Sequence, residues 1–140
     1  MNKRGQLKLS FGMIFSIFLI IIFLALAVYM IIKFINMQHS IQIEIFKNDL
    51  QVDIDAMWQS QQGSREVEYY LPEKINTVCF TDNDYQNLIF DSEKFTGGAN
   101  IEHIDIDVIT LEGDYCIENI GGKVSMVLIK DYGETLVRIT

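Results

Sequence analysis

The feature that most constrains this chain is an uninterrupted apolar run near its N-terminus. Residues 9–32 carry no charge, and only Ser10, Gly12 and Ser16 among them are not apolar. About 20 such residues in a helix cross the ~30 Å hydrocarbon core of a bilayer, because a helix satisfies its own backbone hydrogen bonds where water is absent. The run therefore predicts a transmembrane helix, and it excludes a wholly soluble cytosolic chain.

The charges divide the chain into two unlike parts after Ile35. The first part holds four basic residues and no acidic one, whereas the remainder holds all 19 acidic residues and seven basic ones, a net charge of −12. Three of the four basic residues precede the apolar run, which predicts a cytoplasmic N-terminus and an extracytoplasmic C-terminal part. A single span excludes a polytopic transporter, and so acidic an external part excludes binding of nucleic acid by neutralisation of its phosphates.

A cleaved secretory signal peptide is the alternative interpretation of the run. The triplet Ala25-Leu26-Ala27 has the small-x-small form that signal peptidase recognises. The apolar residues nevertheless continue to Ile32, and the run is longer than the ~7–15 residues of a usual signal-peptide core. We therefore expect the helix to remain in the mature protein.

The helix is expected to continue beyond the membrane. No proline or glycine lies between Met13 and Gln62, so nothing there forces a break. At about 100° per residue, two apolar stripes run along this continuation, which implies two packing partners. One stripe contains Phe34, Met37, Ile41, Ile45, Val52 and Ala56, and the other contains Ile35, Ile43, Phe46, Leu50, Ile54 and Met57.

A strand is the alternative for part of this stretch, because apolar residues between positions 41 and 56 also alternate with a period of two. A strand beginning there would need a connector, and no turn residue precedes it. We therefore predict one helix over residues 9–60, with Gly63 as a left-handed cap at its end.

Beyond Gly63 the sequence changes to short runs rich in β-branched and aromatic residues. Strands are predicted over residues 66–71, 76–80, 104–110, 115–120, 123–130 and 135–139. Turn residues at 112–114, 121–122 and 131–134 predict an antiparallel meander at the C-terminus, and residues 81–100 are expected to be mainly loop.

The expected fold class is α+β, a long N-terminal helix followed by a small antiparallel β-sheet domain. We divide the chain into a basic cytoplasmic segment (1–8), a transmembrane helix (9–35), an amphipathic helical extension (36–62) and an extracytoplasmic β-rich domain (63–140).

Cys79 and Cys116 are the only cysteines, so a single intramolecular pairing exists. The predicted orientation places both in an oxidising compartment, and a β-domain this small commonly needs extra stabilisation. We predict a disulfide, which would contribute roughly 4 kcal/mol in the chain-entropy model. Two separate buried thiols are the alternative.

No catalytic motif occurs in the sequence, and we expect neither an enzyme nor a cofactor. His39 and His103 fall in different predicted elements, and no zinc, nucleophile-elbow or phosphate-loop motif is present. In the predicted strand 104–110, His103, Asp105 and Asp107 would share one face, which we interpret as a solvated outer face.

Two further groups have a structural interpretation. Asp82 and Asp84 alternate like the start of a calcium loop, but the glycine and the terminal glutamate of such a loop are missing, so we expect an acidic surface turn and no metal. Trp58 and the pair Tyr69-Tyr70 could form a ligand platform, although packing between the helix and the β-domain is the interpretation we favour.

The N-terminal residues Lys3-Arg4-Gly5-Gln6, directly before an uncharged apolar helix, resemble the class III signal of archaeal type IV pilin-like proteins. The resemblance implies cleavage between Gly5 and Gln6 by a prepilin peptidase on the cytoplasmic side, with the helix retained. Lys8 and Ser10 stand where many members of that family have serine and glutamate. A major pilin and a minor pilin or pseudopilin are therefore both open.

The resemblance also implies partners and a location. The chain would be held in the cell membrane by its helix, in contact with lipid, and then assembled with other pilin-like subunits into a surface filament or pseudopilus. The alternative function is a bitopic membrane protein whose external β-domain binds a partner protein or an envelope component.

Overall fold

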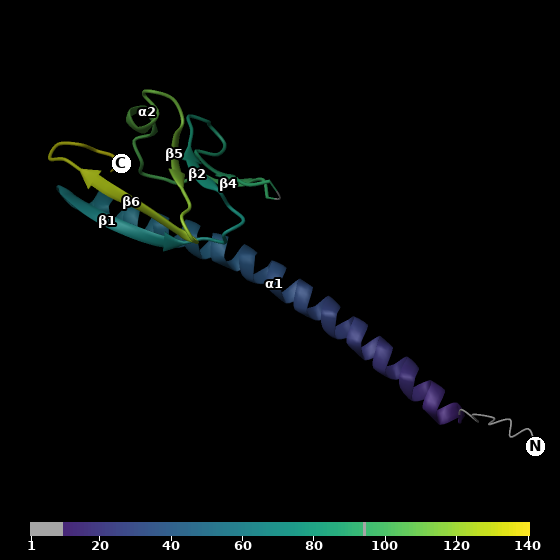
Figure 1. Ribbon diagram of the computed structural model, residues 1–140. Helices are drawn as coiled ribbons and strands as arrows, with labels where there is room; N and C mark the ends of the chain where they lie inside the picture. Colours follow the sequence, from purple (N-terminus) through teal and green to yellow (C-terminus); the bar gives the residue numbers. More distant parts are fainter. Residues whose placement is uncertain (1–9, 94) are drawn as a thin grey trace, which may run out of the picture. The chain divides into compact units, whose positions relative to one another are not determined.

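The computed structural model describes residues 10–93 and 95–140. Two compact units make up the chain, Met1–Gln38 and His39–Thr140. The predicted α+β fold class is confirmed, because one long helix is followed by antiparallel sheets (Figure 1). The elements in chain order are α1 (Phe11–Gln59), β1 (Gly63–Tyr70), β2 (Thr77–Phe80), β3 (Leu88–Asp91), β4 (Gly97–Ala99), α2 (Ile106–Ile109), β5 (Tyr115–Glu118), β6 (Lys123–Lys130) and β7 (Arg138–Ile139).

Helix α1 runs without interruption for 49 residues, so the strand alternative for residues 41–56 is wrong. At its start the Ser10 hydroxyl accepts a hydrogen bond from the backbone N–H of Met13 at 3.3 Å, which satisfies one of the amides that have no partner within the helix. The stretch contains no helix-breaking residue, so the 3.6-residue period persists throughout.

The end of α1 differs from the prediction. Gly63 is not a left-handed cap but the first residue of β1, where it pairs with Lys130 of β6. The Lys130 Nζ donates hydrogen bonds to the backbone oxygens of Trp58 and Ser60, the latter at 2.8 Å. A cation from the sheet therefore satisfies carbonyl groups that the helix leaves without partners.

The strands form two antiparallel sheets, ordered β1-β6-β7 and β4-β3-β2-β5. Figure 1 shows β1 and β6 side by side, and their register places Gly63 opposite Lys130 and Tyr70 opposite Lys123. In the second sheet β2 pairs with both β3 and β5.

The core of the larger unit is shared by α1 and both sheets. The Phe46 ring of α1 makes edge contacts with Tyr69 of β1 and Phe90 of β3, at ring-centroid distances of 5.3 and 5.7 Å. Leu50 and Ile54, one and two turns further along α1, are completely buried. One face of α1 thus packs against both sheets, which share no strand with each other.

Two segments of the β-region differ from the prediction in detail. Residues 81–100 are mainly loop, as predicted, but they also contain β3 and β4, whose four and three residues are too few to show a strand period. Residues 104–110 do not form a strand: Ile104 makes a single bridge to Val137, and α2 follows. The Asp105 carboxylate accepts a hydrogen bond from the N–H of Val108 at 3.3 Å, and this N-cap favours a helical turn.

The C-terminal strands do not form one meander. The turn at residues 131–134 joins the antiparallel strands β6 and β7 as expected. The turn at Gly121 and Gly122 instead separates the sheets, because β5 pairs with β2 while β6 pairs with β1 and β7. Both glycines have positive φ, 62° and 82°, which is the conformation of a tight hairpin turn.

Candidate functional site

In the smaller unit α1 exposes apolar side chains in every direction. All described residues of this unit are exposed, including large apolar ones such as Phe11, Phe23 and Met30. Within the described part of the chain, α1 is the one helix that is long and apolar enough to cross a membrane. A helix that is apolar on all sides requires a lipid or protein environment, so α1 fits a single-pass membrane anchor.

In the larger unit α1 buries only one of its two predicted apolar stripes. The buried residues of the helix are Ile43, Phe46, Leu50, Ile54 and Met57. Residue Ile35, which we assigned to the same stripe, belongs to the smaller unit and is exposed. One of the two partners that the sequence predicted is therefore the chain's own β-domain.

The second stripe is exposed in this unit. Ile41, Ile45 and Val52 have exposed fractions of 47%, 53% and 58%. We call these three residues the exposed stripe. Two nearby carboxylates are paired within the chain, Glu44 with Lys47 at 2.6 Å and Asp53 with Arg65 at 3.2 Å. Asp49, one turn from both Ile45 and Val52, is exposed and makes no ion pair within the described residues.

Apolar side chains on a helix stripe that the chain's own β-domain leaves uncovered form a candidate contact surface. The carboxylate of Asp49 lies beside this stripe, so a partner that covers the stripe must pair this charge or leave it in water. The stripe suits an apolar helix face as its partner, and it is the candidate functional surface of the larger unit.

The predicted processing residues, Gly5 and Gln6, lie outside the described residues. The predicted disulfide is present: Cys79 and Cys116 are bonded and face each other across β2 and β5. It therefore joins two neighbouring strands of one sheet and closes the loop of chain that contains β3, β4 and α2.

The acidic turn at Asp82 and Asp84 is exposed, as expected for a surface turn. The Asn83 side-chain oxygen accepts a hydrogen bond from the N–H of Tyr85 at 2.9 Å, which closes the turn locally. Among the described residues, no group of three or more His, Cys, Asp or Glu side chains could hold a metal ion.

The structure does not place His103, Asp105 and Asp107 on one strand face. His103 has a positive φ of 65°, and its ring stacks on Trp58 with centroids 3.8 Å apart and planes 10° from parallel. Its Nδ1 lies 2.9 Å from the Asp55 carboxylate. Asp105 instead caps α2 and Asp107 lies in the first turn of α2, whereas His103 contacts α1.

The contacts of Asp55 form a polar cluster that the sequence did not predict. Gln51, one turn before it, donates to the Asp55 carboxylate at 2.8 Å and also pairs with the backbone N–H and C=O of Glu102. The hydrogen bond with His103, followed by that with Gln51, holds the pKa of Asp55 below its usual range. The cluster fastens the segment before α2 to the C-terminal turns of α1.

Of the three aromatic residues, Tyr69 packs in the core as predicted, Trp58 packs only in part, and Tyr70 does not pack in the core. Trp58 packs on His103 and remains 38% exposed. Tyr69 is buried and its hydroxyl donates to Asp53 at 2.7 Å; burial, with a smaller effect of that carboxylate, raises the pKa of Tyr69. Tyr70 is exposed, with the Lys123 ammonium 5.5 Å from its ring centroid.

Comparison with known proteins gave no match to a protein family, a curated protein or a solved structure.

Proposed function

We propose that this chain is a type IV pilin-like subunit. It is cut after Gly5 by a prepilin peptidase, anchored in the cell membrane by α1 with its N-terminus in the cytoplasm, and then assembled into a surface filament or pseudopilus. Its role is structural, without enzymatic activity or a cofactor.

The exposed stripe carries this proposal. A membrane anchor needs exposed apolar residues only where lipid surrounds it. In the larger unit, however, one face of α1 is buried against the β-domain while Ile41, Ile45 and Val52 remain exposed on another face. Each of these side chains is about half exposed, so covering it would contribute roughly 1 kcal/mol. Contact with a neighbouring copy repeats this contribution at every subunit of a filament.

The two parts of the chain suit storage and assembly. In the bilayer, the apolar residues of the smaller unit are stable because lipid covers them. In a filament, helices of neighbouring subunits would replace the lipid. The β-rich domain would form the outer layer. It belongs to the part of the chain after Ile35, whose net charge of −12 keeps filaments soluble and separate.

Cysteine cross-linking tests this packing. The native cysteines are bonded to each other, so an introduced cysteine would be the one reactive thiol among the described residues. We expect Ile45→Cys and Val52→Cys to form disulfide-linked dimers under mild oxidation in membranes that contain the assembly machinery. Glu44→Cys is the matched control, because it is exposed on the same helix but lies outside the stripe.

Equal cross-linking at Glu44 and Ile45 would indicate random collision and contradict the proposal. Absence of cross-links at both stripe positions would favour the alternative, a bitopic protein that remains monomeric and uses its β-domain to bind a partner.

A further inference from the structure

Beyond the turn that joins them, β5 and β6 separate, and the outer edge of β5 has no strand partner among the described residues. The first rung beside the turn is regular: Ile120 and Lys123 exchange backbone hydrogen bonds of 3.0 and 3.2 Å. Beyond this rung the strands separate, since β5 pairs with β2 and β6 pairs with β1. An antiparallel hairpin would continue with Glu118 opposite Ser125, but among the described residues no such pair forms.

The register shows which backbone groups of β5 face this gap. The N–H of Asn119 donates to the carbonyl of Asn76 at 2.9 Å, so the backbone of Asn119 faces the segment that leads into β2; the N–H of Asn76 donates instead to Asp91. Hydrogen-bonded pairs alternate along an antiparallel ladder, which makes Ile117 the next residue whose backbone faces β2. The N–H and C=O groups of Cys116 and Glu118 therefore point away from β2, toward the gap.

The hydrogen bonds between β6 and β7 show which backbone groups of β6 face the gap. Val127 exchanges both backbone hydrogen bonds with Thr140, at 2.9 and 3.0 Å, and therefore directs its backbone toward β7. Ser125, two residues earlier, directs its backbone to the same side, where β7 has no residue to pair with it among the described residues. The open edge of β5 and the backbone of one β6 residue, Ser125, thus face one gap.

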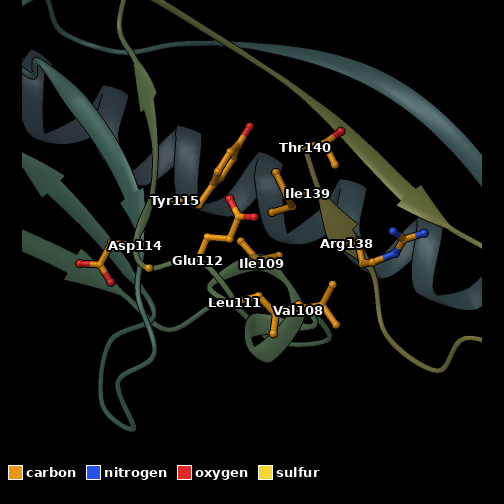
Figure 2. A pocket seen from close by; sticks show the side chains of 10 residues that line it. Val108, Ile109, Leu111, Glu112, Asp114, Tyr115, Arg138, Ile139 and Thr140 are labelled. Atoms are coloured by element: carbon orange, nitrogen blue, oxygen red, sulfur yellow. The ribbon is translucent and has the colours of Figure 1, made fainter.

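The gap is a groove rather than a closed seam. A depression of about 530 Å³ is lined by residues from β1, β5 and β6, among them Glu68, Ile117 and Ser125. A second depression of about 490 Å³ shares Tyr115 with the first and reaches Thr140. Figure 2 shows Tyr115 and Glu112 on one side of this second depression and Ile139 and Thr140 on the other.

The side chains around the groove define the chemistry of an occupant. Glu112, Asp114 and Glu118 carry no ion pair within the described chain. The basic residues of the two depressions are already paired, Lys123 with Glu68 at 3.3 Å, and Arg138 with Glu134 at 3.1 Å and with Asp131. Apolar side chains stand between these carboxylates, including Leu111 and Ile120, which are 78% and 73% exposed.

We infer that this groove binds an extended segment of a partner polypeptide, with alternating basic and apolar side chains, as a β-strand added along the open edge of β5. Backbone hydrogen bonds to Cys116 and Glu118, with the open backbone of Ser125 beside them, hold the segment, and the carboxylates select its basic residues. Helix α1 takes no part, so this interaction is independent of the filament proposal.

The test uses the full chain in detergent micelles and a fluorescent peptide with the sequence Lys-Val-Lys-Val-Lys-Val. Two control peptides are needed: the same sequence with alternate backbone nitrogens methylated, and a Glu-Val version. We expect the methylated peptide, which keeps the charge but loses hydrogen-bond donors, to bind at least about tenfold more weakly. The Glu-Val peptide should also bind at least about tenfold more weakly, because its charges repel the rim.

Hydrogen exchange locates the site. The Lys-Val peptide should slow exchange of the amides of Glu118 and Ser125. Equal binding of the methylated peptide, or unchanged exchange at both amides, would overturn the inference and leave only non-specific attraction to an acidic surface.

A pair of variants at one position adds an independent control. Glu118→Pro removes an N–H that faces the groove and not β2, so the disulfide and the fold should be retained while peptide affinity falls at least about tenfold. Glu118→Gln keeps that N–H and should weaken binding only a few-fold. Equal effects of the two variants would exclude strand addition at β5.

Discussion

The buried lysine of β6 offers a quantitative test of how α1 ends. Lys130 is only 8% exposed, and its Nζ donates to the backbone oxygens of Trp58 and Ser60. Replacing Lys130 with methionine keeps most of the apolar stem but leaves both carbonyl groups without this donor. The variant therefore isolates the contribution of the ammonium group to the junction between helix and sheet.

The magnitude follows from the two contacts. A hydrogen bond that involves a charged group contributes about 1.5–3 kcal/mol, and a cation at a helix C-terminus adds about 0.3–1 kcal/mol. The desolvation of a buried ammonium opposes both effects. We expect Lys130→Met to lower the free energy of unfolding of the larger unit by about 3 kcal/mol.

The assay is urea unfolding of the full chain in detergent, followed by fluorescence of Trp58, the one tryptophan in the sequence. Lys123→Met is the matched control, because Lys123 lies on the same strand but on its exposed side, paired with Glu68. The control should leave the unfolding midpoint nearly unchanged. If both variants shift the midpoint equally, the assigned role of Lys130 in the helix end is incorrect.

Three further predictions concern the larger unit. Reduction of the Cys79–Cys116 disulfide, which spans a sequence separation of 37, should cost about 4 kcal/mol of unfolding free energy, measured by melting with and without reductant. The pKa of Asp55 is lowered in the folded state, so its contribution to stability should be complete above its unfolded pKa of about 3.9. This contribution should be lost as the pH falls through the folded pKa. Asp55→Asn should abolish this loss of stability at acid pH, measured by unfolding curves at a series of pH values. Gly121→Ala should cost about 1 kcal/mol for its positive φ, and Gly122→Ala should lower the melting temperature further because its Cβ would lie 3.2 Å from the oxygen of Leu71.

The sequence was sufficient to predict α1, because a long stretch without proline or glycine and two helical stripes give a strong periodic signal. It could not predict which stripe would be buried. Ile45 and Phe46 are neighbours of similar apolarity, and only the position of Tyr69 and Phe90 in the folded chain distinguishes them. The exposed stripe, on which the functional proposal depends, is therefore a result of tertiary structure.

The polar cluster at the end of α1 had no local signal. Asp55 and His103 are 48 residues apart in the sequence, and the alternation around His103 favoured a strand. The side chain of Asp105 overrode that alternation by capping α2. Short strands were missed for a related reason, since β4 has only three residues and two of them are glycine.

The turn at Gly121 and Gly122 shows a third limit. Its residues correctly predicted a tight turn, and Ile120 and Lys123 do form the first rung of a hairpin. Whether the ladder continues depends on competition from β1 and β2 for the same strands, which local sequence does not encode.

The mass of the mature chain tests the central proposal most directly. Protein taken from its native membranes, with the disulfide intact, can be measured by intact mass spectrometry beside a Gly5→Val variant. The filament-subunit proposal predicts a wild-type chain that begins at Gln6 and a variant that retains its first five residues. A wild-type chain that still carries Met1 to Gly5, or one cut within the apolar run after Ala27, would contradict it.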